Sequence, residues 1–207
     1  MIDKEILASQ IILVGMNEAE VSTIKQPYIG TTALATCVGL IIYNRQTKQA
    51  LVSHLSVEWK YVIEEILIKL LENNFISEEE YIKLKGIFSL YEKYFFDIPN
   101  MDENLKIVLI NKYNFSLKER DEQEKLEFLI IPGYYKNNYN ICEEMTDFFL
   151  SLQSVFSHFK GKTHKNDINH NEMITSNEFV FDSLSGTFIT NQINIDKIVE
   201  EKNKLNT

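Results

Sequence analysis

The sequence predicts an α+β fold: a single-domain layered α/β sandwich with a mixed, largely antiparallel β-sheet and helices packed on it. Two runs rich in β-forming residues, 38–43 and 50–55, are separated by a short polar connection, which is typical of a hairpin. From Trp59 to Leu71, apolar residues recur every three or four positions, as on one face of a helix. The length of 207 residues and the hydrophobic content of 44% suit one domain with its own core.

The composition argues against several classes of protein. The net charge is -9, which lacks the basic surface of a nucleic-acid-binding protein. Two cysteines are too few for a disulfide scaffold or a four-thiolate zinc site. The longest apolar runs fall short of a bilayer span, and residues 1–5 lack the pattern of a Sec signal. We therefore expect no nucleic-acid partner, no membrane insertion, no metal and no other cofactor.

The first half of the chain alternates between strand and helix patterns. The apolar run 11–14 predicts a buried strand that ends at a glycine. Proline and glycine within residues 27–30 predict a break in secondary structure before a new element that begins at Thr31. After the hairpin we expect a helix over 57–71. A second helix is expected from Ser77 to about Tyr94, with carboxylates in its first turn.

The second half is predicted in less detail. Runs 105–110 and 127–131 are typical of strands, and residues 139–159 return to a helical pattern. We expect a polar surface loop over 161–177 and a final hairpin over 179–189. The tail beyond residue 192 is expected to form a short helix or to fray. Since no repeat or linker interrupts the chain, one domain is expected.

The register of the central hairpin places a cysteine near a histidine. A four-residue turn at 44–47 pairs Tyr43 with Lys48 and puts Cys37 opposite His54, with Cβ atoms roughly 4.5 to 5.5 Å apart. A five-residue turn would break this alignment. A thiol reacts as its thiolate, so a neighbouring imidazole has chemical value. The other interpretation is a buried apolar cysteine beside a core histidine.

The same residues resemble a known family. Residues 30–44, GTTALATCVGLIIYN, followed by KQALVSH at 48–54, are similar to the signature of the CheD chemotaxis receptor deamidases. That family has a threonine six residues before the cysteine and a histidine seventeen after it, and Thr31, Cys37 and His54 match both spacings. Toxins of the cytotoxic necrotizing factor type use a similar Cys–His site. The resemblance implies a deamidase domain over 9–192, an expanded helical middle at about 75–125, and a polar C-terminal tail over 193–207.

The resemblance implies a protein-glutamine deamidase, which hydrolyses a glutamine side-chain amide to glutamate through a thioester. Cys37 would be the nucleophile, His54 would take the thiol proton, and Thr31 would orient the imidazole, with Thr32 as the fallback. The partner would be a protein with an accessible glutamine, either a bacterial chemoreceptor or a host protein. The corresponding location is the bacterial cytoplasm, or a host cell reached by a Sec-independent route.

Several features keep alternatives open. Ala35-Thr36 replaces the Gly-Ser that usually precedes the family's cysteine, which is compatible with a catalytically silent CheD-like binding module. Amide hydrolysis or transglutamination on another substrate is a further alternative. Cys142 is expected to have a packing role. Three histidines, His158, His164 and His170, lack the spacing of a zinc site. An aromatic cluster is expected to belong to the core or to form a docking patch: Phe88, Tyr91, Tyr94, Phe95 and Phe96.

Overall fold

The computed structural model describes residues 4–34, 37–56, 58–95, 126–132, 159–163, 178–189 and 195–205. The helices within these ranges are α1 (Lys4–Gln10), the 3-10 helix η1 (Trp59–Tyr61), α2 (Ile63–Glu72), α3 (Glu78–Phe95) and α6 (Ile195–Leu205). The strands are β1 (Ile11–Val14), β2 (Ala19–Val21), β3 (Tyr28–Thr31), β4 (Val38–Asn44), β5 (Gln49–Leu55), β6 (Leu126–Pro132), β7 (Phe159–Thr163), β8 (Phe179–Asp182) and β9 (Thr187–Phe188).

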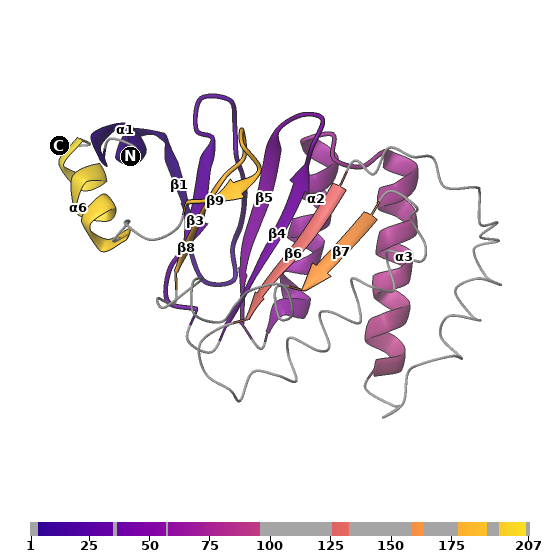
Figure 1. The fold of residues 1–207 in the computed structure, drawn as a ribbon. Coiled ribbons are helices and arrows are strands. Elements are labelled where there is room, and N and C mark those ends of the chain that lie inside the picture. Colours follow the sequence, from indigo (N-terminus) through magenta and orange to yellow (C-terminus); the bar gives the residue numbers. More distant parts are fainter. Residues whose placement is uncertain are drawn as a thin grey trace.

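These elements form four layers, helix–sheet–sheet–helix (Figure 1). The described strands make two sheets, with orders β1-β3-β8-β9 and β2-β5-β4-β6-β7. Helices α1 and α6 pack together beside the first sheet, and α2 contacts β2 and β5 of the second. Both sheets mix parallel and antiparallel pairs. The predicted α+β sandwich is confirmed, with two sheets in place of one.

Period-two alternation builds a core on each face of the first sheet. Between the sheets, β1, β3 and β8 contribute Val14, Ile29, Phe179 and Phe181, which pack with Ile41 and other residues of the second sheet. The intervening positions of β1 and β8 face outward, where Ile11 and Val180 pack with α1 and α6. Alternate residues of each strand thus lie on opposite faces of the first sheet. On β3, Ile29 and Thr31 face the second sheet.

The chain crosses from one sheet to the other directly after β1. Met16 makes a parallel bridge with His54 of β5, and β2 then pairs antiparallel with β5. The turn between the strands is closed by the Glu18 N–H, which donates to the Gly15 carbonyl at 3.2 Å. Strands that switch sheets in this way bring the two layers close together at a corner. The corner lies beside the end of β5 that carries His54.

The register of the β4–β5 hairpin differs from the prediction. Tyr43 pairs with Ala50, not with Lys48, and Gly39, not Cys37, lies opposite His54. The connection does have four residues, but it starts one residue later, because the Asn44 side-chain Oδ1 accepts hydrogen bonds from the Gln46 and Thr47 amides. Asn44 is thus the last ladder residue and also closes the turn. The shift moves the partner of every β4 residue by two positions and keeps each side chain on its face.

The first expected helix is present as η1 and α2, within 59–72, and the second as α3, over 78–95. Buried residues of α2 (Ile63, Ile66, Leu67 and Leu70) form the predicted apolar stripe. At the start of α3, Ser77 and Glu80 form a reciprocal capping box: the Ser77 N–H donates to Glu80 Oε2 at 2.7 Å, and the Glu80 N–H donates to Ser77 Oγ at 3.3 Å. The predicted capped start is confirmed.

Other expectations have mixed outcomes. The strand at 127–131 and the hairpin at 179–189 are confirmed by β6, β8 and β9, and α6 lies within the predicted tail. The polar loop expected over 161–177 is wrong at its start, because residues 161–163 belong to β7, which pairs in parallel with β6. The break in secondary structure expected at 27–30 is wrong, because residues 28–30 lie within β3, which ends at Thr31. The segments 105–110 and 139–158 lie outside the described residues, and the helix expected to reach Phe159 is wrong at that residue, which begins β7.

No helix in the described ranges combines the length and the apolar content needed to cross a membrane.

Two glycines allow β8 to approach its neighbours closely. A Cβ on Gly30 would collide with the backbone carbonyl of Phe179 across the ladder. A Cβ on Gly39 would lie 2.5 Å from Cε1 of the Phe179 ring. Phe179 therefore occupies the space that the missing side chains leave.

We expect Gly30→Ala to destabilise the protein more than Gly39→Ala, because a ring can rotate away and a ladder carbonyl cannot. Overpacking of this kind costs about 1–3 kcal/mol, and Gly30→Ala should lie at or above the upper end of that range. Urea unfolding of both variants gives the comparison. Equal losses of stability would show that the Phe179 ring is as rigidly held as the backbone.

Candidate functional site

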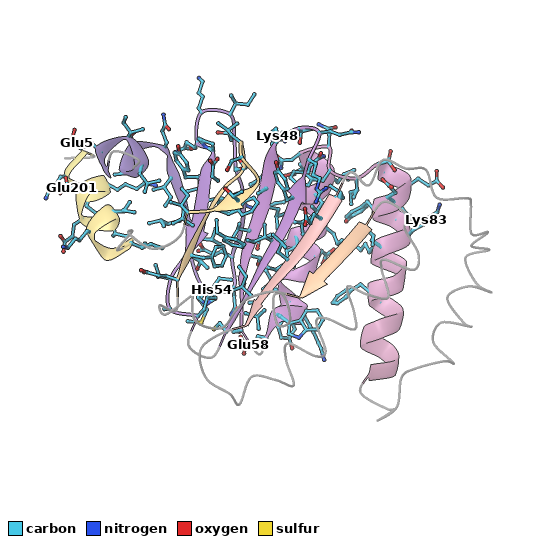
Figure 2. All side chains as sticks on the ribbon, in the orientation of Figure 1. Glu5, Lys48, His54, Glu58, Lys83 and Glu201 are labelled. Carbon is cyan, nitrogen blue, oxygen red and sulfur yellow. The ribbon has the colours of Figure 1, made fainter. Side chains whose placement is uncertain are left out.

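Thr31 and His54 meet at the corner between the sheets. Thr31 ends β3 and is 1% exposed, and His54 is the second-last residue of β5 and is 2% exposed. Figure 2 shows His54 at the end of the sheets opposite the hairpin turn, which Lys48 marks. Thr31 Oγ1 and His54 Nδ1 are 2.8 Å apart, which is a hydrogen bond. The two residues that the spacing singled out are therefore in direct contact across 23 positions of chain.

The hydrogen bonds of Thr31 assign the imidazole tautomer. Thr31 Oγ1 lies 2.7 Å from the carbonyl oxygen of Val14, its partner in the β1–β3 ladder. A hydroxyl has one proton to donate, and a carbonyl can only accept. When the Thr31 proton is donated to Val14, His54 Nδ1 must carry the proton of the second hydrogen bond. The lone pair of His54 is then on Nε2.

The remaining ring nitrogen has the environment of a base. His54 Nε2 is buried and has no hydrogen-bond partner among the described residues. Burial lowers the pKa of His54 below its ordinary value of 6.5, because the charged imidazolium loses solvation. The ring is thus held neutral, the form that can accept a proton, with its acceptor nitrogen unused.

Cys37 lies immediately before β4 and is 4% exposed, within the core between the sheets. Side chains two residues apart along a strand lie on the same face, so Cys37 shares a face of the hairpin with Gly39. Gly39 is paired directly with His54, and Cys37 therefore lies on the face of His54 but diagonal to it. The Cys37 thiol does not hydrogen-bond to Nε2, since that nitrogen has no partner. The structure joins Thr31 to His54 and leaves Cys37 on the same face, diagonal to the imidazole.

Gly39 and Phe179 fill the space beside His54. Because Gly39 has no side chain, the position opposite His54 is occupied by the ring of Phe179, which comes from the other sheet. Phe179 also makes an edge-to-face contact with Phe188, with centroids 5.9 Å apart. The Phe179 ring therefore lies against the strand position that is paired with His54. Sequence reasoning missed this pair, although a glycine opposite a buried histidine is a usable signal.

The described residues between Thr31 and Cys37, which are 32–34, include an unusual backbone angle. Ala33 has a φ of 59° and is exposed, whereas Leu34 beside it is buried in the core between the sheets. A residue with a Cβ disfavours this left-handed region, so the loop holds conformational strain just before the thiol. Thr32, the fallback for Thr31, is not needed in that role, because Thr31 itself contacts the imidazole. Ala35 and Thr36 lie outside the described residues.

Within the part of the chain that the structure describes, no other candidate residue belongs to this site. Cys142, His158, His164 and His170 lie outside the described residues. Within the described ranges, no three His, Cys, Asp or Glu side chains converge as a metal site would require. Of the aromatic cluster on α3, Phe88 is buried, which fits a core role for that residue.

No protein-family model matches the chain, and no curated protein matches it either. The CheD resemblance therefore depends on the motif spacing, and the geometry of Thr31 and His54 is independent of it.

Replacing Thr31 separates the role of its hydroxyl from that of its shape. Thr31→Val should destabilise the protein by about 1–3 kcal/mol, because the Val14 carbonyl and His54 Nδ1 lose a buried partner. Thr31→Ser should recover most of this loss. In ¹⁵N NMR of the imidazole, the wild type and Thr31→Ser should show the proton on Nδ1, and Thr31→Val should lose that preference. A proton on Nε2 in the wild type would contradict the tautomer assignment.

The pKa of His54 predicts how stability changes with pH. Because the folded-state pKa is lowered below 6.5, the unfolded chain binds more protons once the pH falls below that value. The stability associated with the neutral His54 is therefore fully present above about pH 6.5. The free energy of unfolding decreases as the pH falls from there toward the folded-state pKa of His54. Urea unfolding at a series of pH values should show this decline in the wild type and a smaller decline in His54→Gln. Parallel pH profiles would rule out a lowered pKa.

Proposed function

We propose that this protein is a thiol-dependent amidohydrolase, a deamidase that converts glutamine side chains of a target protein to glutamate. The observation that carries the proposal is the Thr31–His54 hydrogen bond, which directs the lone pair of a neutral, buried imidazole to Nε2. This arrangement serves a general base, since one nitrogen is anchored and the other is available. Cys37 on the same strand face supplies the nucleophile.

The proposed reaction has two steps. The Cys37 sulfur attacks the carboxamide carbon while His54 Nε2 takes the thiol proton, and the C–N bond breaks as that proton passes to the departing ammonia. A thioester links Cys37 to the target. His54 then takes a proton from water, the resulting hydroxide attacks the thioester, and the released thiolate recovers its proton. The products are glutamate in the target and one ammonia.

Reaction requires the thiol to approach Nε2. The diagonal position of Cys37 places it on the same face of the hairpin as His54, as a diagonal neighbour across the ladder. Hydrogen bonds of catalytic groups are often long before substrate binds and tighten in the complex. Backbone amides near Cys37 are the candidate oxyanion donors.

The target class follows from charge and from the family resemblance. A net charge of -9 favours a neutral or basic protein surface over nucleic acid. The resemblance favours a chemoreceptor in the bacterial cytoplasm, and the divergent Ala35-Thr36 and expanded middle allow a host protein reached by Sec-independent delivery. The target is a protein with a surface glutamine in both cases.

A catalytically silent binding module is the second candidate. It is favoured by two observations: Nε2 has no hydrogen bond from the thiol, and the core between the sheets covers Cys37. In that case Thr31 and His54 would stabilise the corner between the sheets, and the protein would bind its partner without changing it.

Alkylation and deamidation together separate these functions. With a panel of chemoreceptor cytoplasmic domains and host signalling proteins, we expect release of ammonia and a mass increase of about 1 Da at a glutamine. Cys37→Ser should lower the rate by about a thousandfold or more, as the loss of a nucleophile does. Cys142→Ser is the matched control and should retain activity.

The same variants allow the thiol to be tested without a substrate. Iodoacetamide at pH 7 should modify Cys37 faster in the wild type than in His54→Gln, because a nearby base raises the reactive fraction of the thiol. A Cys37 that stays unmodified at neutral pH would favour the binding module. Attachment of an added primary amine to the glutamine would instead identify a transglutaminase.

A further inference from the structure

The turn that links β1 to β2 holds the backbone of His54 on both sides. The Asn17 N–H donates to the His54 carbonyl at 2.7 Å, and the His54 N–H donates to the Glu18 carbonyl at 3.2 Å. The Glu18 carbonyl also accepts a hydrogen bond from Ser53 Oγ at 2.7 Å. Both backbone groups of His54 are therefore bound by residues 17–18, which lie at the corner where the chain changes sheets.

Asn17 adds a side-chain contact beyond the end of the strand. Its Oδ1 accepts a hydrogen bond from the Ser56 N–H at 3.2 Å. β5 ends at Leu55, so Ser56 lies past the ladder with β4. Asn17 thus holds the residue two positions after the histidine, at the point where the strand would otherwise begin to fray.

The backbone of Asn17 has the conformation that these contacts require. Its φ is 60°, in the left-handed region that asparagine and glycine adopt most readily. In this conformation one residue presents its N–H to His54 and its side-chain oxygen to Ser56. A substitution can therefore remove the side-chain acceptor and keep the backbone angle, because glycine accepts the same φ.

We propose that Asn17 is a positioning residue for His54, which clamps the backbone at positions 54 and 56 and so keeps the imidazole Nδ1 within hydrogen-bond distance of Thr31. Thr31 is fixed independently by β3, which pairs with β1 and β8. The 2.8 Å contact therefore depends on where the end of β5 lies relative to β3. The consequence for catalysis rests on the proposed function, whereas the geometry of the ring does not.

The test compares two asparagines with the same backbone angle. Asn17→Gly removes the acceptor for Ser56 and keeps the left-handed φ, and Asn17→Asp restores an acceptor of the same length. Asn74, with a φ of 58° after the end of α2, is the matched control through Asn74→Gly. The readout is the exchange rate of the His54 Nδ1 proton in ¹⁵N-histidine-labelled protein at pH 8, assigned with His54→Gln.

We expect Nδ1 proton exchange to become about three- to tenfold faster in Asn17→Gly, the change that loss of one hydrogen bond gives when local opening limits exchange. Asn17→Asp should return the rate to within about twofold of the wild type. Asn74→Gly should leave it unchanged even if the melting temperature falls by a similar amount. Faster exchange in both glycine variants, or in neither, would overturn the positioning role.

Deamidation is measured in the same variants as a second readout. If the proposed function holds, Asn17→Gly should lower kcat more than it raises KM, since it displaces the base and leaves the target surface intact. A lowered kcat with unchanged exchange, or a changed KM alone, would contradict the clamp. If neither the wild type nor any variant deamidates any target, the proposed function fails. The rate of Nδ1 proton exchange still decides whether Asn17 is a positioning residue.

Discussion

The single proton of the Thr31 hydroxyl is the constraint on which the arrangement at the corner depends. Because that proton is committed to the Val14 carbonyl, the imidazole must donate through Nδ1, and Nε2 becomes the acceptor. A ladder contact within one sheet thereby determines the chemistry of a side chain from the other sheet. The backbone of β1 is thus part of the site, although it contributes no side chain to it.

The corner between the sheets gathers buried polar groups that stabilise one another. Thr31, His54 and the turn at 17–18 satisfy one another's hydrogen bonds, as any buried polar cluster must. Nε2 is the exception, a buried acceptor with no partner within the described residues. A buried imidazole nitrogen with no partner in the described residues is available to accept a proton, which is the physical basis of the function proposed for the corner.

Local patterns predicted the elements well and the long-range geometry poorly. Strand and helix periodicity identified β1, the β4–β5 hairpin, α2 and α3, because each buries one face whose spacing is visible in the sequence. The hairpin register was wrong, since Asn44 both ends the ladder and closes the turn. Gly30 was interpreted as a turn signal, whereas it lies in β3 where β8 approaches closely. β7 was missed because its residues 160–163, KGKT, have no apolar pattern.

The crossing of the chain between sheets has a consequence for the order of folding. The β4–β5 hairpin joins residues close in sequence, whereas the contacts of His54 with Thr31 and Asn17 close loops of more than twenty residues and carry a larger entropic cost. Local pairs form before such distant ones. We therefore expect the hairpin to exist first with an ordinary, hydrated histidine. The imidazole becomes buried, and its pKa falls below the ordinary value, only when the two sheets close on each other.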